Sequence, residues 1–299
     1  MRLLSAICLV LLLTVSGWAQ TIRPVADEVI GHVVKEGEDL FDIAFSNRLA
    51  VDHLAYANGF PITTMKAKPG TKVIVPFARV LPSNPPHNGL VVNLPERGVY
   101  LFRNGQYDGF YPISIGDEIE QKGRFWTRWG SYAVIEKVKN PIWYPPSWSE
   151  IKGPVGPGPD NPLGDRWIGL SLERTGFHGT NDPYNIGNSV THGCMRMYPE
   201  NVRELYEKVQ VGWPVRIEYE TAKLGRGRDG RIYVITFNDV YRKSNPVQAA
   251  HALLQKAGLE GQIGRKNFDA ILELGLGFPI TVEGTEPVFD ELDKRVSWK

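Results

Sequence analysis

The chain has 299 residues, of which 42% are hydrophobic, with 34 basic and 33 acidic side chains and a formal net charge of +1. This near balance argues against nucleic acid or an anionic surface as the main partner. The length predicts more than one hydrophobic core.

The chain opens with a segment typical of a secretory signal. One basic residue precedes the apolar run LLSAICLVLLLTVSGW, and the small residues Gly17 and Ala19 form a cleavage site, so we expect residues 1–19 to be removed on export. The run is too short to span a bilayer comfortably, which predicts a periplasmic protein without membrane insertion after cleavage. Cys8 leaves with the signal, and Cys194 then remains as the single cysteine. The alternative is an uncleaved anchor.

Residues 31–76 show the order strand, helix, helix, strand, because two stretches with apolar residues at helical spacing lie between two short β-type runs. Three stretches, VVKEGEDLFDIA, LAYANG and KPGTKVIVP, resemble a LysM domain, a family that binds the N-acetylated glycan strands of peptidoglycan or chitin. The resemblance implies a small βααβ fold with glycan contacts from the loops at 37–39 and 58–61. The alternative is a packing domain without a ligand.

Residues 77–88 are proline-rich and predict a stiff, extended linker. Residues 89–220 follow as a mainly β domain, for which short runs of branched and aromatic residues predict a β-sandwich or meander with one or two helices. Asn104 and Gly105 predict a type I′ hairpin turn within it.

A loop rich in proline and glycine interrupts this domain at residues 140–165 and carries Trp143, Tyr144 and Trp148. Loops of this length inside a compact domain are often functional. Two roles stay open: the loop lines or covers a cleft, or it is a surface excursion packed on its own aromatic side chains.

Residues 221–299 predict a small α+β segment of unknown role. RIYVITFNDVY favours a strand, and NPVQAAHALLQKAG favours a helix capped by Asn245 with Pro246 in its first turn. NFDAILELGLG predicts a second helix, and FPITVEG a last strand. The segment shows no catalytic constellation.

The stretch FHGTNDPYNIGNSVTHGCMRMYPENV contains Cys194 in glycine- and asparagine-rich surroundings. A lone thiol in an oxidising space is a liability unless its chemistry is used. If the chain is extended there, His192, Cys194 and Arg196 face one side while Gly193 and Met195 face the other. The thiol thereby gains a cation as its neighbour.

The next stretch, PENVRELYEKV, predicts a helix, and its buried face is expected to consist of Val202, Leu205, Tyr206 and Val209. Cys194 therefore lies at a strand-to-turn junction ahead of a helix, where the N–H groups of Gly193 and Cys194 are expected to be free to bind an anion. Two histidines compete to act as the base for the thiol: His178 at the end of a strand, and His192, which is very near in sequence.

The motif HGT, followed by THGCMRM and preceded by KGRFW and KNPIWYPP, resembles the signature of L,D-transpeptidases with a YkuD-type domain. The resemblance implies that Cys194 is the nucleophile and His178 its base. It implies that the carbonyl of Gly179 orients the imidazole in place of a carboxylate.

The same resemblance implies that His192 and Gly193, with Cys194, supply an oxyanion site through their N–H groups. Thr191 and Arg196 are candidates for positioning the substrate. For His192, a structural role in the loop is favoured over proton transfer.

The implied reaction is a two-step acyl transfer that needs no cofactor and no metal. The thiolate attacks the carbonyl of the bond between diaminopimelate (or lysine) and the terminal D-alanine of a tetrapeptide stem, and D-alanine leaves. An amine then attacks the thioester and releases the thiol. The implied partners are peptidoglycan glycan strands and stem peptides. The acceptor is either another stem or the lysine of a wall-anchored outer-membrane lipoprotein.

Other activities stay open at this point. An L,D-carboxypeptidase uses the same thioester with water as acceptor. A sortase also has histidine before cysteine and arginine after it, but its histidine lies much farther upstream and it lacks the HGC motif. A non-catalytic peptidoglycan-binding protein is expected to have lost Cys194 or His178, and neither is lost. A zinc site formed by His178, His192 and Cys194 lacks a fourth ligand and a metal-type spacing.

Overall fold

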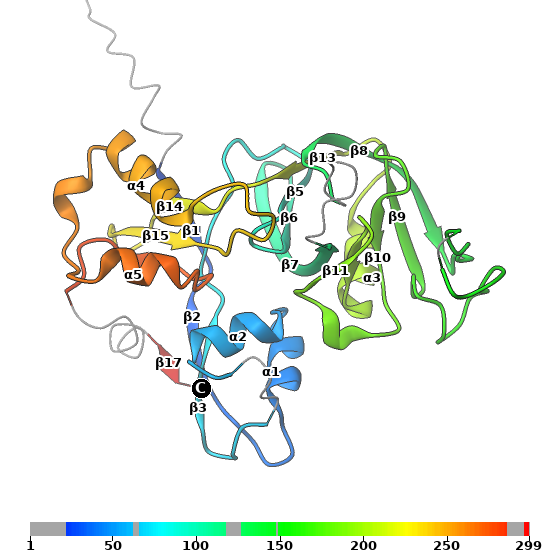
Figure 1. Ribbon diagram of the computed structural model, residues 1–299, viewed down its shortest axis with the longest axis horizontal. Coiled ribbons are helices and arrows are strands. Elements are labelled where there is room, and N and C mark those ends of the chain that lie inside the picture. Colours follow the sequence, from blue (N-terminus) through cyan, green and yellow to red (C-terminus); the bar gives the residue numbers. More distant parts are fainter. Residues whose placement is uncertain (1–21, 62–65, 118–126, 148, 286–295, 299) are drawn as a thin grey trace, which may run out of the picture.

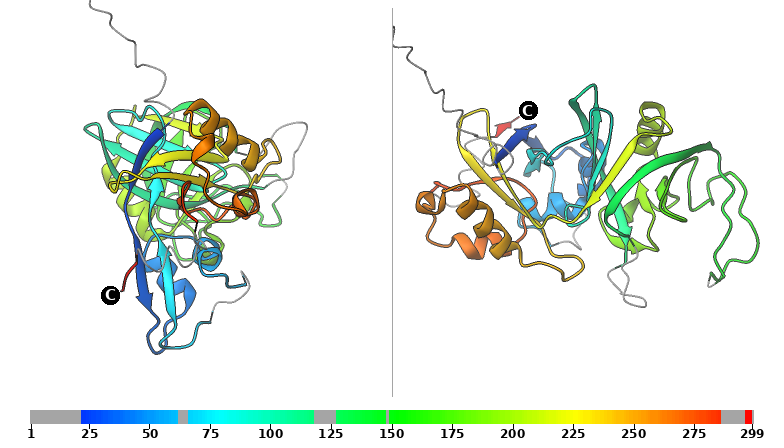
Figure 2. Two further views of the ribbon diagram at one scale, coloured as in Figure 1. Left: turned by 90° about the vertical axis from the view of Figure 1, so that its left-hand side faces the viewer. Right: turned by 90° about the horizontal axis from the view of Figure 1, so that it is seen from above.

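The computed structural model describes residues 22–61, 66–117, 127–147, 149–285 and 296–298. The expected signal at 1–19, the KGRFW motif at 122–126 and Trp148 lie outside these residues. Figure 1 shows a strand-rich barrel at one end of the molecule, a sheet with helices at the other, and a small helical unit below their junction. The right-hand view of Figure 2 shows the same three parts from above.

The small unit has the order strand, helix, helix, strand. Its elements are β2 (Val29–Val33), α1 (Leu40–Ser46), α2 (Val51–Ala57) and β3 (Lys72–Pro76). β2 and β3 pair antiparallel, and the apolar faces of both helices are buried with β3 in one core. Asp39 and Asp42 form a capping box at the start of α1, since each carboxylate accepts the other residue's N–H, at 2.8 and 3.1 Å. This element order is as predicted, whereas the assignment to LysM stays a prediction.

Polar side chains in the two loops expected to contact glycan also form bonds within the unit. Asn58 Nδ2 donates to the carbonyl oxygens of Leu54 and Ile74, and its Oδ1 accepts the Ile74 N–H, all at 2.7–2.8 Å. Glu38 lies 2.6 Å from the ring nitrogen of His32. These contacts fix the shape of both loops.

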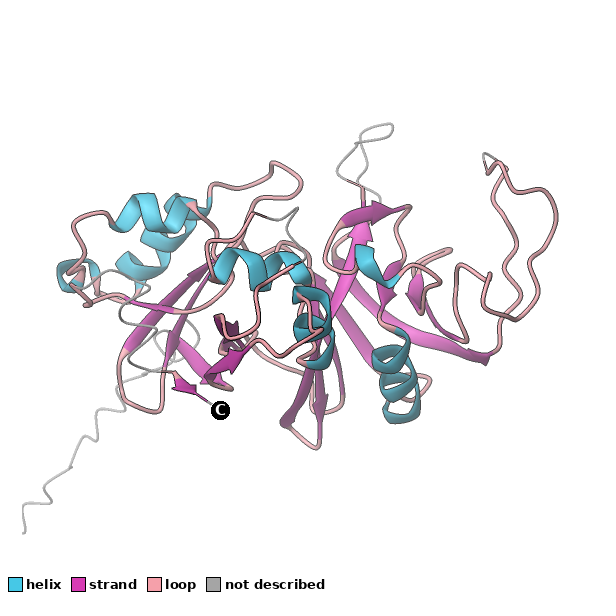
Figure 3. Ribbon diagram, turned by 90° about the horizontal axis from the view of Figure 1, so that it is seen from below, coloured by secondary structure: helices cyan, strands magenta, loops and turns pink. Residues whose placement is uncertain are grey.

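The strands between Gly89 and Glu218 close into a ring. Hydrogen-bonded neighbours run β7, β12, β10, β9, β8, β13, β5, β6 and back to β7, with β11 added beside β7. The strands are β5 (Gly89–Asn93), β6 (Gly98–Arg103), β7 (Gln106–Gly116), β8 (Gly130–Lys139), β9 (Arg166–Leu170), β10 (Gly176–His178), β11 (Ser189–Thr191), β12 (Met195–Met197) and β13 (Pro214–Glu218). Because every strand of the ring has two neighbours, the ring leaves no open sheet edge. Figure 3 shows its strands in magenta with helices on the outside.

The mainly β character is as predicted, but the pairing of the strands corrects the expectation of a meander. Three neighbouring pairs are parallel: β13 with β5, β10 with β12, and β11 with β7. A meander is antiparallel throughout, whereas parallel neighbours need crossover connections. The predicted hairpin is present, since Asn104 and Gly105 have φ values of 52° and 73°, the positive pair that a type I′ turn requires.

One α-helix, α3 (Pro199–Lys208), packs against the ring, and a short 3₁₀ turn, η1 (Pro183–Asn185), precedes β11. The buried face of α3 and its end contains the predicted residues Val202, Leu205, Tyr206 and Val209, and Asn201 in addition. Tyr198 directly precedes the helix, and its hydroxyl donates a hydrogen bond to the Leu49 carbonyl oxygen at 3.1 Å. The start of the helix therefore also contacts the small unit.

The C-terminal segment shares a sheet with the start of the described chain. Its order is β16, β15, β14, β1, β4, and β1 pairs parallel with β14. The elements are β1 (Ile22–Ala26), β4 (Arg79–Val80), β14 (Ala222–Arg226), β15 (Ile232–Thr236), α4 (Pro246–Lys256), η2 (Glu260–Gln262), α5 (Phe268–Glu273), β16 (Ile280–Thr281) and β17 (Ser297–Trp298). Asn245 caps α4 as predicted, accepting the Gln248 N–H at 3.0 Å. β17 pairs with β2 of the small unit.

This sheet joins segments that were predicted from the sequence to be separate. The predicted linker at 77–88 contains β4, which pairs antiparallel with β1. β1 and β4 are too short to show a period, and the other partner of β1, strand β14, lies far along the chain. No local pattern therefore indicates the pairing.

A buried ionic cluster fastens the linker, the barrel and the C-terminal sheet together. Lys223 Nζ lies 2.5 Å from Glu96 Oε2, and Tyr100 Oη donates to Glu96 Oε1 at 2.6 Å. Arg79 lies 3.7 Å from the same carboxylate. All four side chains are at most 1% exposed. We call these four residues the Glu96 cluster.

Candidate active site

Cys194 lies between two short strands, β11 and β12, which pair with opposite sides of β7. Thr191 ends β11, which pairs with β7, and Met195 begins β12, which lies between β7 and β10. Met195 and Met197 are fully buried in the barrel core, so Cys194 and Arg196 face the other way, as the alternation predicts.

His192 does not follow this alternation. It is exposed and lies in a bend, because Gly193 has a φ of +113°, a conformation that favours glycine and breaks the strand. The expectation that His192 shares an extended face with Cys194 is therefore wrong.

The loop is tightened by the Thr191 hydroxyl. Thr191 Oγ1 donates to the Cys194 carbonyl oxygen at 2.6 Å and accepts the Gly193 N–H at 3.3 Å. This corrects the expectation that the Gly193 N–H is free, since the turn at Gly193 directs that group back onto Thr191. Within the described ranges the Cys194 N–H forms no hydrogen bond, so it is the amide here that can bind an oxyanion.

The thiol is half-buried and held by the turn between β9 and β10. Cys194 Sγ donates to the Arg174 carbonyl oxygen at 3.4 Å, and Arg174 has a φ of 55°, a left-handed conformation uncommon outside glycine. Burial raises the pKa of the thiol to about 11, although the Gly176 amide and the Arg196 charge act in the opposite direction. The thiol is therefore protonated at neutral pH.

His178 ends β10, directly beside the strand that follows the thiol. β10 and β12 are parallel, with Phe177 opposite Met195 and His178 opposite Arg196. The imidazole Nδ1 lies 2.6 Å from the Gly179 carbonyl oxygen, and because a carbonyl only accepts, Nδ1 carries the proton and Nε2 has a free lone pair.

The imidazole is neutral in its resting state. Burial lowers the pKa of His178 to about 4, the Arg196 charge acts in the same direction, and the Gly179 carbonyl opposes both. In the described part of the chain no hydrogen bond joins the imidazole to the Cys194 thiol. Deprotonation by His178 thus requires the thiol to leave the Arg174 carbonyl.

Arg196 is half-buried and lies on the same face as both groups. It belongs to the central strand β12, opposite His178 on one side and Ser114 on the other. Its Nε is buried without a hydrogen-bond partner among the described residues. Burial lowers the pKa of its guanidinium, while Asp182 and the thiol raise it.

The loop at 140–165 meets the site at its C-terminal end. A Cβ placed on Gly164 would lie 3.0 Å from the Gly179 Cα, so the two backbones touch. Asn161 holds this end, because its Nδ2 donates to the Pro141 carbonyl oxygen at 2.8 Å. Tyr144, in the middle of the loop, is 71% exposed. The contact at Gly179 braces the carbonyl that orients His178.

Three residues near the thiol were missed from the sequence. Arg174 and Gly176 contact the sulfur from the β9–β10 turn, and Thr127 Oγ1 donates to the Gly193 carbonyl oxygen at 3.1 Å. Thr127 directly follows the KGRFW motif, and this position is the one signal that pointed to it.

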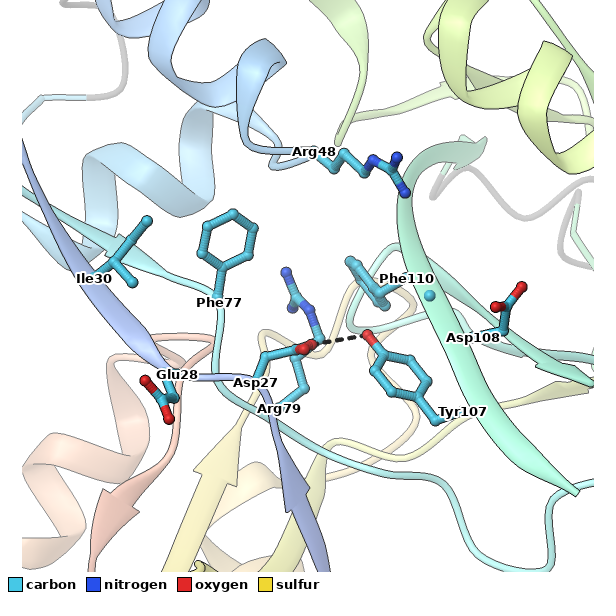
Figure 4. Close-up of a pocket in the computed structure, with 10 residues that line it drawn as sticks. Asp27, Glu28, Ile30, Arg48, Phe77, Arg79, Tyr107, Asp108 and Phe110 are labelled. Carbon is cyan, nitrogen blue, oxygen red and sulfur yellow. Dashed lines mark hydrogen bonds between the residues drawn. The ribbon is translucent and has the colours of Figure 1, made fainter. Parts of the chain in front are cut away.

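A separate groove of about 620 Å³ lies between the small unit, the connection from β1 to β2 and the barrel, and contains none of the predicted site residues (Figure 4). Tyr107 Oη donates to Asp27 Oδ2 across it at 2.9 Å. Arg79 lies 3.5 Å over the Phe110 ring at its floor, with both terminal nitrogens buried. Its lining residues are Asp27, Glu28, Ile30, Arg48, Phe77, Arg79, Tyr107, Asp108, Gly109 and Phe110.

The described residues contain no cluster of three or more histidine, cysteine, aspartate or glutamate side chains arranged to hold a metal ion. Among the same residues, no helix has the length and apolar character needed to cross a membrane.

Residues 87–217 match the L,D-transpeptidase catalytic domain family, YkuD. A Bacillus licheniformis protein named as a candidate L,D-transpeptidase, YkuD, is 30% identical over 184 residues, which cover 62% of this chain and 96% of that protein. An Escherichia coli K12 protein named as a probable L,D-transpeptidase, YbiS, is 31% identical over 188 residues. The match covers 59% of this chain and 59% of the length of that relative.

A solved L,D-transpeptidase from Mycobacterium smegmatis is 18% identical, with a TM-score of 0.34, over 50% of this chain and 63% of that chain. The matched range 87–217 contains the barrel and all seven predicted site residues, Cys194, His178, Gly179, His192, Gly193, Arg196 and Thr191. The chain belongs to the L,D-transpeptidase family, with a YkuD-type catalytic domain.

Proposed function

We propose that this protein is a cysteine-dependent L,D-transpeptidase acting on peptidoglycan. The observation that carries the proposal is the pair of parallel strands β10 and β12, which places His178, with its Nε2 lone pair available, opposite Arg196, two residues from Cys194. The unbonded Cys194 N–H adds an oxyanion donor at the same point.

The proposed first step forms a thioester. His178 Nε2 accepts the thiol proton as Cys194 Sγ attacks the carbonyl carbon before the terminal D-alanine, and the carbonyl oxygen becomes an oxyanion at the Cys194 N–H. The carbon–nitrogen bond then breaks, and the imidazolium returns the proton to the departing amine of D-alanine.

The second step consumes the thioester. An amine acceptor attacks its carbonyl carbon, His178 accepts the amine proton, the carbon–sulfur bond breaks, and the proton passes to the sulfur. The product is a new amide and the original thiol.

The pKa values indicate how the proton moves. Because the pKa of the thiol is about 11 and that of the imidazole about 4, a thiolate–imidazolium pair is strongly disfavoured at rest. We expect proton transfer to accompany the attack, with Gly179 holding the imidazole tautomer through the developing charge.

The acceptor and location belong to the same proposal. The signal-like residues 1–19 support export to the periplasm. The LysM-like residues 31–76 support retention on existing wall, where amine acceptors are concentrated. The acceptor is another stem's amine or the lysine of a wall-anchored lipoprotein, and the loop at 140–165 is proposed to limit access of water.

The nucleophile is tested by acylation. Wild type incubated with a carbapenem is expected to gain the mass of one adduct on Cys194, and Cys194→Ala none, while circular dichroism stays unchanged. His178→Ala is expected to slow acylation by about 10²-fold or more. An adduct on Cys194→Ala rules out this nucleophile, and a loss below tenfold for His178→Ala moves the base to His192.

The acceptor is tested with disaccharide-tetrapeptide and, in parallel, with added lipoprotein. Mass analysis is expected to show dimers or a lipoprotein conjugate. Tripeptide as the main product in both reactions identifies a carboxypeptidase instead.

Glycan retention is tested without truncation, because β2 also pairs with β17 and the small unit is therefore joined to the C-terminal end. Pro61→Glu, at an exposed position of the second loop, is expected to weaken pull-down by insoluble peptidoglycan and leave acylation unchanged. Gln262→Glu makes the same charge change at an exposed position of the C-terminal segment and is expected to bind like wild type. Equal binding by all three proteins removes the LysM-like loops from the proposal.

A further inference from the structure

Tyr241 belongs to the C-terminal segment but lies in the core of the barrel. It follows β15, is 3% exposed and packs in the same apolar cluster as the barrel strands. Its ring stacks on Tyr219 at 5.8 Å between centroids. This side chain therefore connects the segment of unknown role to the domain that carries the thiol.

Three hydrogen bonds lead from Tyr241 to the thiol loop. Tyr241 Oη donates to the Gly116 carbonyl oxygen at 3.0 Å, the Gly116 N–H donates to Thr127 Oγ1 at 2.8 Å, and Thr127 Oγ1 donates to the Gly193 carbonyl oxygen at 3.1 Å. We call this the Tyr241 chain. Thr127 is fully buried, so water does not compete for its bonds.

Thr127 also lies directly beside the phenol. Burial raises the pKa of Tyr241 to about 12, whereas the neighbouring hydroxyl and amide of Thr127 act in the opposite direction. The phenol thus contacts both Gly116 and Thr127, the two residues that connect it to Gly193.

The last bond of the chain acts on the peptide group that carries the oxyanion donor. The Gly193 carbonyl and the Cys194 N–H belong to one planar trans peptide, so holding the oxygen fixes the direction of the N–H. Thr191 holds the neighbouring groups, the Gly193 N–H and the Cys194 carbonyl. The Tyr241 chain supplies the constraint that Thr191 does not.

We infer that Tyr241 is a positioning residue that fixes the direction of the Cys194 N–H through this chain. The inference rests on the proposed acyl transfer and gives the C-terminal segment a role in it. Donors aimed at the developing oxyanion matter mainly in the transition state. Loss of the phenol hydroxyl therefore slows acylation and leaves reagent binding unchanged.

The test compares two reactions of the same thiol. Tyr241→Phe keeps the ring and removes the hydroxyl, and single-turnover acylation by a carbapenem is expected to be about tenfold slower at saturation, with an unchanged half-saturating concentration. Alkylation by iodoacetamide is a displacement at carbon that forms no oxyanion, and it is expected to stay within about twofold of wild type. Tyr233→Phe is the matched control, because Tyr233 Oη donates to Asp229 Oδ2 within the C-terminal segment at 2.6 Å.

Thr127 variants test the route of the effect. Thr127→Val is expected to slow acylation, Thr127→Ser to retain it, and the double variant Tyr241→Phe/Thr127→Val to be no slower than the slower single variant. Multiplied losses in the double variant contradict the chain. Two outcomes contradict the positioning role: acylation of Tyr241→Phe at the wild-type rate, or an equal slowing of its acylation and alkylation.

A readout without turnover separates this inference from the proposed function. Residues 22–299 contain one cysteine, so selective ¹⁵N-cysteine labelling gives a single amide resonance. That resonance is expected to shift in Tyr241→Phe and to stay in place in Tyr233→Phe. Wild type that forms no acyl adduct overturns the proposed function, whereas an unmoved Cys194 resonance overturns the inference about Tyr241.

Discussion

Cys194 and His178 form a pair that rests in its uncharged state, because burial acts on both groups in the direction of neutrality. It raises the pKa of the thiol and lowers that of the imidazole. Arg196 assists the thiolate but disfavours the imidazolium, so its single charge does not stabilise the ion pair as a whole. Reactivity at this site therefore depends on the substrate and the oxyanion donor more than on a preformed thiolate.

The first prediction concerns the pH dependence of the thiol. Since the pKa of Cys194 is about 11, its iodoacetamide alkylation rate is expected to rise about tenfold per pH unit from pH 6 to 9 without levelling off. The same protein in urea is the control, and its rate should level off near pH 9. A rate for the folded protein that is flat across this range indicates a resting thiolate and contradicts the neutral pair.

At the residue scale, the motif identified Cys194 and His178 as candidates, and their placement on adjacent strands is consistent with that interpretation. The Gly193 amide was assigned incorrectly, because a sequence does not show that the turn directs it onto Thr191. Tyr241 and Arg174 had no local signal. Their contacts with the site arise from strand pairing and packing over long sequence separations.

At the scale of elements, the Glu96 cluster decides how the linker, barrel and C-terminal sheet stay together. Burial alone raises the pKa of the Glu96 carboxyl, but Lys223 and Arg79 more than offset it and hold the pKa below its ordinary value. One carboxylate thus balances two buried cations. The cluster is asymmetric, and its members are not equally replaceable.

The second prediction uses this asymmetry. Glu96→Gln leaves two buried cations unbalanced and is expected to lower the free energy of unfolding by about 3 to 5 kcal/mol. Lys223→Met leaves Glu96 with Arg79 and is expected to cost less. Urea denaturation of both variants and of the double variant checks this order, and the double variant should be more stable than Glu96→Gln alone. A larger loss for Lys223→Met contradicts the charge balance.

Elements with a local cause were predictable from the sequence. The Asn245 cap, the Asn104-Gly105 turn and the buried face of α3 follow from cap chemistry, positive φ and helical spacing. The ring of strands and the sharing of β1 with the C-terminal sheet were not predictable. They depend on which distant strands meet, and residue type does not encode that choice.

At the scale of the whole molecule, a buried histidine lies where the small unit meets the C-terminal segment. His53 on α2 is buried against the C-terminal segment, where a Cβ on Gly277 would lie 2.7 Å from its Nε2. Burial lowers the pKa of His53 to about 4, with Arg79 and Arg97 acting in the same direction and Asp52 and Glu96 opposing. His53 and His178 are thus both neutral in the folded protein and protonated in the unfolded chain below pH 6.5.

The third prediction concerns acid stability. A histidine with a depressed pKa contributes stability that is present above the unfolded value of 6.5 and lost as the pH falls through about 4. Each of the two contributes a change of the order of 3 kcal/mol over this window. The free energy of unfolding in urea is therefore expected to fall clearly between pH 7 and 4.5.

The matched variants for this prediction are His53→Gln and His251→Gln. His53→Gln is expected to reduce the pH dependence, whereas the partly exposed His251, bonded to Asp269 on the surface of α4 and α5, is expected to have little effect. Identical pH dependence in His53→Gln and wild type contradicts a neutral, buried His53.

The parallel pairing of β1 with β14 has a consequence for the order in which the chain folds. Ile22 pairs with Leu224, so β1 emerges from the ribosome long before its partner strand β14 has been made. The edge of β1 that pairs with β14, and the apolar side chains that pack against it, stay exposed until nearly the whole barrel has been made. A contact of such long sequence separation forms late and slowly. The pairing therefore makes completion of the fold a late event, and until then the open edge of β1 is a site where chaperones or a second unfolded copy can bind.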